Sequence, residues 1–248
     1  MREKMDATPE WIFSFVIWWF VGVAALIIAI SAIPYLYRWL TERFYKQIAE
    51  ERGWHYEKHP SEIPSSTTTR YGKAYSKHRS VFRRWIDTAG IHRIVGPAIF
   101  GDCNTRKFTV AHYAEKIHIH RAGTYATHYT LIGAPHKGIV GNVYISKEGI
   151  LQKIGKALGM QDVELGDPIF DPMFRIKGSY MKIREVLDIS ARQKLLGIIS
   201  QYGWKNFGVL EINQKEVVFT KDKVIKNKDF LLAIIDLVTT IANNVDKY

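Results

Sequence analysis

The sequence predicts an α+β protein in which an N-terminal transmembrane helix precedes a cytoplasmic domain of antiparallel sheet with packed helices. Residues 11–37 form an uncharged run long enough to cross a bilayer. Residues 97–145 alternate between apolar and polar side chains in short segments separated by turn residues, which is typical of antiparallel strands. Apolar side chains at helical spacing between residues 188 and 245 predict helices that pack on this sheet.

The membrane anchor is predicted from the length of residues 11–37 and from what they lack. The run contains no Asp, Glu, Lys or Arg. As a helix it would measure about 40 Å, against a hydrocarbon core of about 30 Å. A cleaved signal peptide is the alternative, but its apolar core is shorter and ends at a small-residue cleavage site. Here the run ends in aromatic residues of the kind that lie at headgroup depth, namely Tyr35, Tyr37 and Trp39. We therefore predict an uncleaved, single-pass anchor in the cell (inner or cytoplasmic) membrane.

The charges that flank the anchor predict its orientation. The polar tail, residues 1–10, carries two basic and three acidic side chains. The residues that follow the anchor include four basic ones, Arg38, Arg43, Lys46 and Arg52. Because positively charged flanks stay in the cytoplasm, we expect the N-terminus outside and the large C-terminal domain in the cytoplasm.

Composition limits the function classes. The chain has 248 residues, a formal net charge of +11 and a pI near 9.6. A basic chain suits an anionic partner such as lipid headgroups or nucleic acid, although the same charge also keeps a protein soluble. A hydrophobic content of 47% is ordinary once the anchor is allowed for and does not indicate an intrinsically disordered chain. The single cysteine, Cys103, excludes an intramolecular disulfide framework.

Four segments are predicted along the chain. They are a tail (1–10), the transmembrane helix (11–37), an amphipathic helix with a strand entry (38–57) and a soluble α+β domain (58–248), with an alternative division near residue 160. Leu40, Phe44 and Ile48 at four-residue spacing continue the helix out of the membrane, and Gly53 predicts its end. Residues 58–69 are predicted as a loop. Strands over 97–103, 107–120, 125–132 and 138–145 predict a four-stranded antiparallel meander.

The second half of the chain predicts further helices and a hairpin. Ser146 is expected to be the N-cap of a helix over residues 147–158. Asn227 is expected to cap a last helix, residues 228–245, which is too short for a second membrane span. Between them we expect strands at 162–165 and 173–176, a helix or helix pair over 179–187 and 188–201, and a hairpin of 207–212 with 216–220.

Residues 170–196 carry a pattern of packing residues. Phe170, Asp171, Phe174 and Ile176 precede a polar turn and a helix that ends at Leu187, and Leu195 and Leu196 lie in the following helix. With the hairpin, the last helix and Gly53-Trp54 after the amphipathic helix, this pattern resembles an F-[DN]-x-x-F strand-helix module of uncharacterised membrane-anchored bacterial and archaeal proteins. The resemblance is closest over residues 167–245. It implies an anchored α+β domain and no catalytic residues.

Residues 70–85 form the most basic stretch of the chain. They contain no acidic residue, aromatic residues are interleaved, and the basic residues are Arg70, Lys73, Lys77, Arg79, Arg83 and Arg84. Near an anionic leaflet each Lys or Arg contributes about 1 kcal/mol of attraction. Three interpretations stay open: a surface for anionic lipid, a surface for nucleic acid or an acidic protein, and a solvated strand or loop whose aromatic side chains enter the core. Nucleic acid is disfavoured because no binding fold is recognisable.

Other candidate sites give weaker signals. His112, His118 and His120 are expected on one strand face, with His128 on the adjacent strand. A zinc site needs three or four convergent ligands, so we interpret these histidines as solvent-facing side chains. Cys103 has no recognisable activating base. Asp167 and Asp171 fit turn chemistry better than a cation site.

The sequence thus predicts a non-enzymatic, single-span membrane protein with a cytoplasmic interaction or scaffolding domain, as a subunit or adaptor of a membrane-associated assembly. We expect no cofactor and no metal. The expected partners are the lipid bilayer and either other proteins or a second copy of the chain. The alternatives are a membrane-bound, metal-dependent enzyme that uses the face of His112, His118 and His120, and a tethered binder of anionic lipid or nucleic acid through residues 70–85.

Overall fold

The computed structural model describes residues 10–58, 92–119, 123–138, 141–147, 162–178 and 182–247. The predicted loop after residue 58 and almost all of the predicted helix over 147–158 lie outside these ranges. The chain divides into two compact units, Met1–Arg43 and Phe44–Tyr248. The second unit is a mixed structure of helices and antiparallel strands, as predicted.

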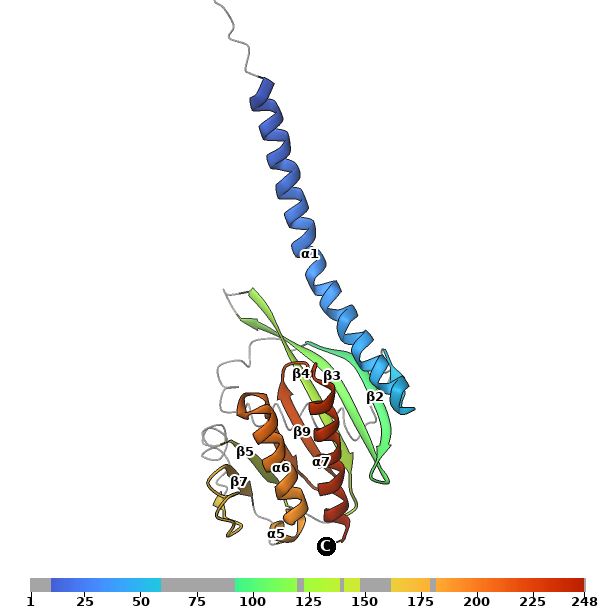
Figure 1. Cartoon of the computed structure of the whole chain (residues 1–248), viewed down its shortest axis with the longest axis vertical. Coiled ribbons are helices and arrows are strands. Elements are labelled where there is room, and N and C mark those ends of the chain that lie inside the picture. Colours follow the sequence, from blue (N-terminus) through green and yellow to red (C-terminus); the bar gives the residue numbers. More distant parts are fainter. Residues whose placement is uncertain are drawn as a thin grey trace, which may run out of the picture. The chain divides into compact units, whose positions relative to one another are not determined.

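Helix α1 (Glu10–Arg52) is one continuous helix that includes the predicted span, and Pro34 lies within it (Figure 1). Its last nine residues, 44–52, belong to the second unit. Gly53 ends the helix in a left-handed conformation with φ of 68°. The Trp54 N–H donates to the Ala49 carbonyl at 2.8 Å. The predicted continuation of the helix and its glycine stop are confirmed.

Among the described residues of the second unit, nine strands form one sheet, and every pair in it is antiparallel. Its order is β1-β2-β3-β4-β9-β8-β5-β7-β6. The strands are β1 (His55–Glu57), β2 (His92–Cys103), β3 (Arg106–Ile119), β4 (Gly123–Pro135), β5 (Val143–Lys147), β6 (Asp162–Val163), β7 (Phe174–Gly178), β8 (Val209–Ile212) and β9 (Glu216–Asp222).

The predicted four-stranded meander is correct for three strands and wrong for the fourth. Strands β2, β3 and β4 are consecutive neighbours. Strand β5 does not pair with β4, because the β8–β9 hairpin lies between them. Strand β9 forms a seven-residue register with β4, from Tyr129 to Pro135. The side chains of Val217, Val218 and Phe219 in β9 are buried. Strand β9 therefore pairs with β4 along this apolar segment, and β5 pairs with β7 and β8 instead.

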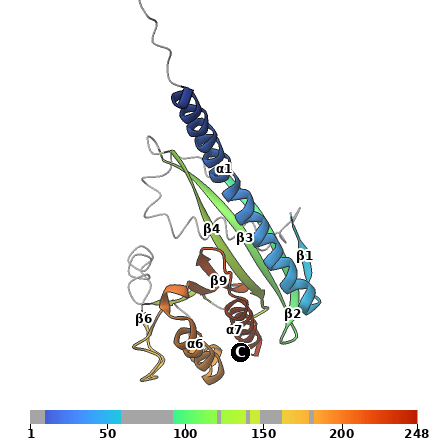
Figure 2. The same cartoon turned by 45° about the horizontal axis from the view of Figure 1, so that its top comes forward.

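The described helices of the second unit are α5 (Ile183–Val186), α6 (Ile189–Tyr202), the 3₁₀ turn η1 (Trp204–Asn206) and α7 (Lys228–Lys247). Figures 1 and 2 show α6 and α7 side by side. Asn227 caps α7 as predicted, since its Oδ1 accepts from the Phe230 N–H at 2.9 Å. The carboxylate of Asp188 caps α6 by accepting from the Ala191 N–H at 2.8 Å.

Side chains from α7 and from one sheet face form a large part of the core. Phe219 of β9 packs against Phe230 of α7 and against Phe207, with ring centroids 6.3 and 5.4 Å apart. The predicted apolar side of α7 is buried, including Ile234, Val238 and Ile241. The prediction for Ser146 is wrong: this residue is buried within β5 and its hydroxyl donates to the Lys147 carbonyl. The strand continues through Ser146 and Lys147, which pair with Arg175 and Phe174 of β7, so no helix starts at that position.

Candidate membrane anchor and candidate polar sites

One N-terminal helix, α1, is long and apolar enough to span a membrane in the part of the chain that the structure describes. Its apolar side chains point outward along the span: Trp18 is 70% exposed and Ile28 is 69% exposed. A helix satisfies its own backbone hydrogen bonds, which is what a segment in hydrocarbon requires. The outward apolar side chains of α1 therefore fit lipid as their surroundings.

Charged residues follow the apolar run of α1, beginning at Arg38. Arg38 Nε donates to Glu42 Oε1 at 2.9 Å. The guanidinium carbon of Arg43 lies 5.3 Å from the ring centroid of Trp39. Contacts of this kind, one turn apart on a helix, contribute about 0.2–0.5 kcal/mol each. They support the continuation of α1 into water without adding a chemical site.

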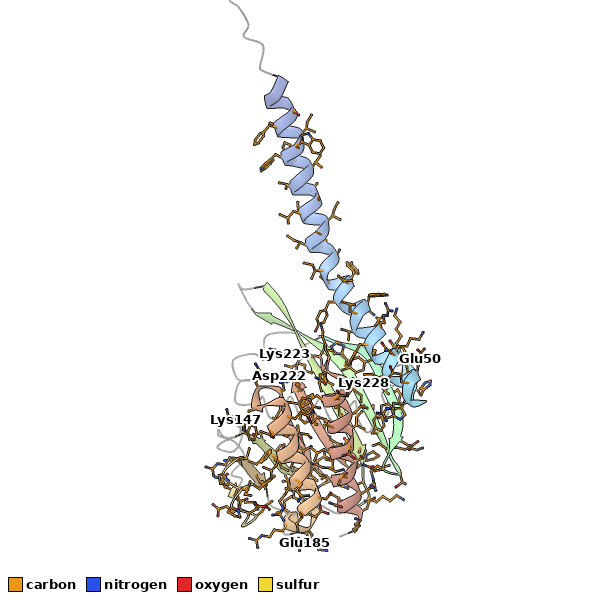
Figure 3. The ribbon with its side chains drawn as sticks, in the orientation of Figure 1. Glu50, Lys147, Glu185, Asp222, Lys223 and Lys228 are labelled. Carbon is orange, nitrogen blue, oxygen red and sulfur yellow. The ribbon has the colours of Figure 1, made fainter. Side chains whose placement is uncertain are left out.

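The last turns of α1 are part of the folded second unit. Tyr45, Ile48 and Ala49 are buried. Glu51 forms an ion pair with Lys228 at the start of α7. Figure 3 shows the neighbouring Glu50 on α1 and Lys228 on α7. Residues 44–52 of α1 are thus held in the second unit by the burial of apolar side chains and by an ion pair.

The basic stretch predicted as an anionic-surface site lies outside the described residues. This applies to all six of its basic side chains: Arg70, Lys73, Lys77, Arg79, Arg83 and Arg84. The anionic-surface site therefore stays a prediction from the sequence.

The interpretation of the histidines as solvent-facing is wrong for His112. This residue is buried, because its face of β3 continues the face of Phe108 and Val110 that packs into the core. His112 and His118 lie in one strand, β3, six residues apart. At about 3.3 Å per residue their backbones are about 20 Å apart, whereas zinc ligands all lie about 2 Å from one ion.

The remaining histidines of the candidate metal face cannot be placed with His112. His120 and the side chain of His118 lie outside the described residues. Among the described residues, no group of three His, Cys, Asp or Glu side chains is placed to hold a metal ion.

The turn interpretation of the two Asp-Pro steps is confirmed. The carboxylate of Asp171 accepts hydrogen bonds from the backbone N–H groups of Leu165, Gly166 and Asp167, at 3.1, 2.8 and 3.0 Å. Asp167 accepts from the N–H groups of Ile169 and Phe170 and pairs with Arg192 at 2.7 Å. These hydrogen bonds, followed by Arg192, hold the pKa of Asp167 below its ordinary value. Both carboxylates are therefore occupied in shaping the loop.

The loop places the aromatic pair of the F-[DN]-x-x-F pattern in the core. The rings of Phe170 and Phe174 are stacked with centroids 4.4 Å apart. Phe174 also contacts Trp204 and Phe207, at 4.9 and 5.9 Å between centroids. In this chain, the aspartate of the pattern caps the loop while its two phenylalanines pack, which is a folding role.

A carboxylic acid with an unusual environment, Glu211, was not predicted. Glu211 of β8 lies opposite Tyr144 of β5 in the sheet, and the Tyr144 hydroxyl donates to Glu211 Oε1 at 3.3 Å. Burial raises the pKa of Glu211 to about 7, although hydrogen bonds from Tyr144 and Asn213 act in the opposite direction. Burial also raises the pKa of the Tyr144 phenol. The pattern Leu210-Glu211-Ile212 predicts an acid on a solvated strand face, so the sequence holds no signal for this pair.

A second polar group links the β2–β3 turn to α7. Arg106 donates to Asn243 Oδ1 at 2.5 Å, to the Pro135 carbonyl at 2.5 Å and to Asp246 Oδ2 at 2.6 Å. Asn104 Nδ2 donates to Asp236 Oδ1 at 2.8 Å. Cys103 is partly exposed, and its backbone lies opposite that of Arg106 in the β2–β3 register. These contacts join three elements and give the group a structural role.

Comparisons with known proteins place the chain in no family. No family model matches the sequence, and no curated protein matches it. Among solved structures, the chain is similar to the mycobacterial trehalose monomycolate transport factor A, TtfA, at 14% sequence identity and a TM-score of 0.44. That similarity covers 83% of this chain and 94% of the other. At this TM-score the similarity carries no argument about function.

Proposed function

We propose that this chain is a single-pass membrane protein whose C-terminal α+β domain lies in the cytoplasm and serves as an interaction or scaffolding module of a membrane-associated assembly. The observation that carries the proposal is that one helix, α1, contains the apolar span and also supplies buried residues such as Tyr45 and Ile48 to the folded domain. A domain built onto the end of its own anchor offers partners an attachment point that stays at the membrane.

The flanking charges support the cytoplasmic orientation. Arg38, Arg43, Lys46 and Arg52 follow the span, while acidic residues balance the basic ones in the tail. Basic residues close to the end of a span stay on the cytoplasmic side. The domain that follows the span is then cytoplasmic, where its single cysteine meets reducing conditions.

The contacts of four described polar side chains support an interaction role in preference to catalysis. Asp167, Asp171, Arg106 and Asp246 bond to the chain's own backbone and side chains. A catalytic centre instead gathers groups with matched pKa values around a space for substrate. We accordingly propose a non-enzymatic domain, and we propose that residues 167–245 correspond to the F-[DN]-x-x-F module of the uncharacterised anchored proteins.

A second candidate function is binding of anionic lipid through residues 70–85. Its support is the six basic side chains of that stretch and the absence of any acid within it. An anchor on the same chain would keep lipid headgroups at a high effective concentration near such a segment.

Extraction and cross-linking test the proposed function. We expect the full chain to resist alkaline carbonate extraction, and a variant without residues 1–37 to appear in the supernatant. Cross-linking of the full chain in native membranes should then recover one stoichiometric partner through the domain. Complete extraction of the full chain by carbonate would refute the anchor. Turnover of a substrate by the purified chain in an activity screen would refute the non-enzymatic role.

A further inference from the structure

Two isoleucines of the second unit face solvent. Among the described residues of this unit, Ile169 and Ile189 are the only large apolar side chains that are exposed, at 66% and 67%. Ile169 lies in the loop between β6 and β7, and Ile189 is the first residue of α6. Single exposed apolar side chains are common on soluble domains. These two, however, lie on neighbouring elements, because an ion pair of 2.7 Å joins Asp167 of the loop to Arg192 of α6.

Four other exposed residues accompany the two isoleucines. Two are prolines of the same loop, and two are charged residues of α5, which directly precedes α6. Arg184 Nη2 donates to the Glu164 carbonyl at 3.3 Å, so α5 contacts the segment that leads into the loop. The whole set combines exposed apolar side chains with one basic and one acidic side chain. We name it the isoleucine patch, and its members are Pro168, Ile169, Pro172, Arg184, Glu185 and Ile189.

The local structure presents both isoleucines in fixed positions. The carboxylate of Asp171 accepts from three backbone N–H groups of the loop, and that of Asp167 accepts from two more. Phe170, which follows Ile169, is fully buried. The cap of α6 is the carboxylate of Asp188. Neither isoleucine side chain is needed for these contacts, and a side chain on an ordered backbone loses little conformational entropy on binding. Both isoleucines therefore suit a contact surface.

We propose that the isoleucine patch is the contact surface between two copies of this chain, which are related by a two-fold axis. This inference rests on the proposed interaction role of the domain and names its partner. In a two-fold contact the same patch meets itself, so its residues must be complementary to one another. The isoleucines of the two copies bury apolar surface together. Arg184 of each copy pairs with Glu185 of the other, so the contact holds two such pairs.

Charge favours a second copy as the occupant of the patch. The chain has a formal net charge of +11, so two copies repel each other overall. The isoleucine patch carries one arginine and one glutamate, so it meets itself without net repulsion. A surface that binds an acidic or a basic partner would carry an excess of the opposite sign. The patch is smaller than the roughly 20–30 residues a side of a stable interface, so we expect a weak dimer.

Cross-linking of single-cysteine variants of the full chain in mild detergent tests the proposal. In a Cys103→Ser background, Ser190→Cys places an exposed thiol beside Ile189 and leaves the patch unchanged. Lys223→Cys is the matched control, because Lys223 is also exposed and Figure 3 shows it far from Glu185. A short bis-maleimide is added, and covalent dimers are measured by gel electrophoresis. We expect dimers through Ser190→Cys and none through Lys223→Cys.

Charge reversal tests whether Arg184 and Glu185 pair across the contact. In the Ser190→Cys chain, Arg184→Glu gives the patch two acids and Glu185→Arg gives it two bases, so each variant meets itself with like charges. We expect each reversal alone to lower the dimer yield about tenfold. An equimolar mixture of the two variants should restore the yield, because an acidic patch then meets a basic one. Recovery in the mixture would also show that both variants are folded.

Several outcomes would overturn the two-copy contact. They are the absence of dimers through Ser190→Cys, equal dimers through Lys223→Cys, a yield that neither reversal changes, and a yield that does not recover in the mixture. Cross-linking of Ser190→Cys in native membranes to a different protein in place of a second copy would also overturn it, but would support the proposed interaction role. The proposed function fails separately, if carbonate extracts the full chain or if the purified chain turns over a substrate.

Discussion

Neutralising Glu211 tests whether the sheet holds a carboxyl group that resists ionisation. In the wild-type chain, burial raises the pKa of Glu211 from an ordinary 4.5 to about 7. The folded state therefore holds a proton between these two pH values that the unfolded state releases. Its contribution to stability is fully present below pH 4.5 and is lost as the pH rises through 7. The substitution Glu211→Gln keeps the shape of the side chain and a carbonyl acceptor for Tyr144 without any charge.

The size of the effect follows from the shift. A pKa difference of about 2.5 units corresponds to about 3 kcal/mol at most between pH 4.5 and pH 8. The side chain is half-buried, so water screens part of this penalty. We expect Glu211→Gln to raise the free energy of unfolding by about 1–2 kcal/mol at pH 8 and to leave it nearly unchanged at pH 4.5.

Pulse proteolysis of the full chain in mild detergent over a urea series, at pH 4.5, 6, 7 and 8, measures this difference. Comparison with the wild type at each pH cancels the titration of every other group. Glu185→Gln is the control, because this acid of α5 is exposed and its neutralisation should change stability little. Parallel stability curves for wild type and Glu211→Gln from pH 4.5 to 8 would refute the reasoning.

Three further predictions concern a loop carboxylate, a turn residue with positive φ and a buried histidine. Asp171→Asn should destabilise the domain by about 2–4 kcal/mol, because an amide cannot accept from all three backbone N–H groups. Asp188→Asn, a cap that retains its acceptor, should be nearly neutral in the same denaturation assay. Thr105→Gly should stabilise by about 0.5–1 kcal/mol in thermal unfolding, since this β-branched residue has φ of 62°; a loss of stability would show that Thr105 is not strained. Burial lowers the pKa of His136, so the free energy of unfolding should fall as the pH drops below 6.5. The substitution His136→Gln should make the free energy of unfolding less dependent on pH in that range. An equal pH dependence in wild type and variant would contradict this.

Sequence reasoning was accurate where a structure depends on near neighbours in the chain. Helix α1 follows from an uncharged run and an apolar spacing, and its end follows from Gly53. The cap at Asn227 and the β8–β9 hairpin are equally local. The loop roles of Asp167 and Asp171 were predicted because an aspartate bonds to backbone groups only a few residues away.

The errors arise where distant segments compete. Strand β5 fits a meander by its sequence, but the β8–β9 hairpin, which comes much later in the chain, takes the edge of β4 instead. His112 alternates with apolar residues, which predicts a solvent-facing side chain, but its face of β3 packs into the core. In the sequence Glu211 looks like an ordinary surface acid, whereas burial in the folded sheet raises its pKa. Burial of this kind depends on the whole sheet and not on a local pattern.

Labelling from outside the cell tests the anchored, cytoplasmic account most directly. In a Cys103→Ser background, one full-length variant carries Ala7→Cys in the tail and another carries Glu185→Cys in the domain. A membrane-impermeant maleimide is added to intact cells and to permeabilised cells. The account predicts that the tail cysteine is labelled in intact cells and that the domain cysteine is labelled only after permeabilisation. Labelling of Glu185→Cys in intact cells, with the tail protected, would contradict the orientation. Release of both variants into the soluble fraction would contradict the anchor itself.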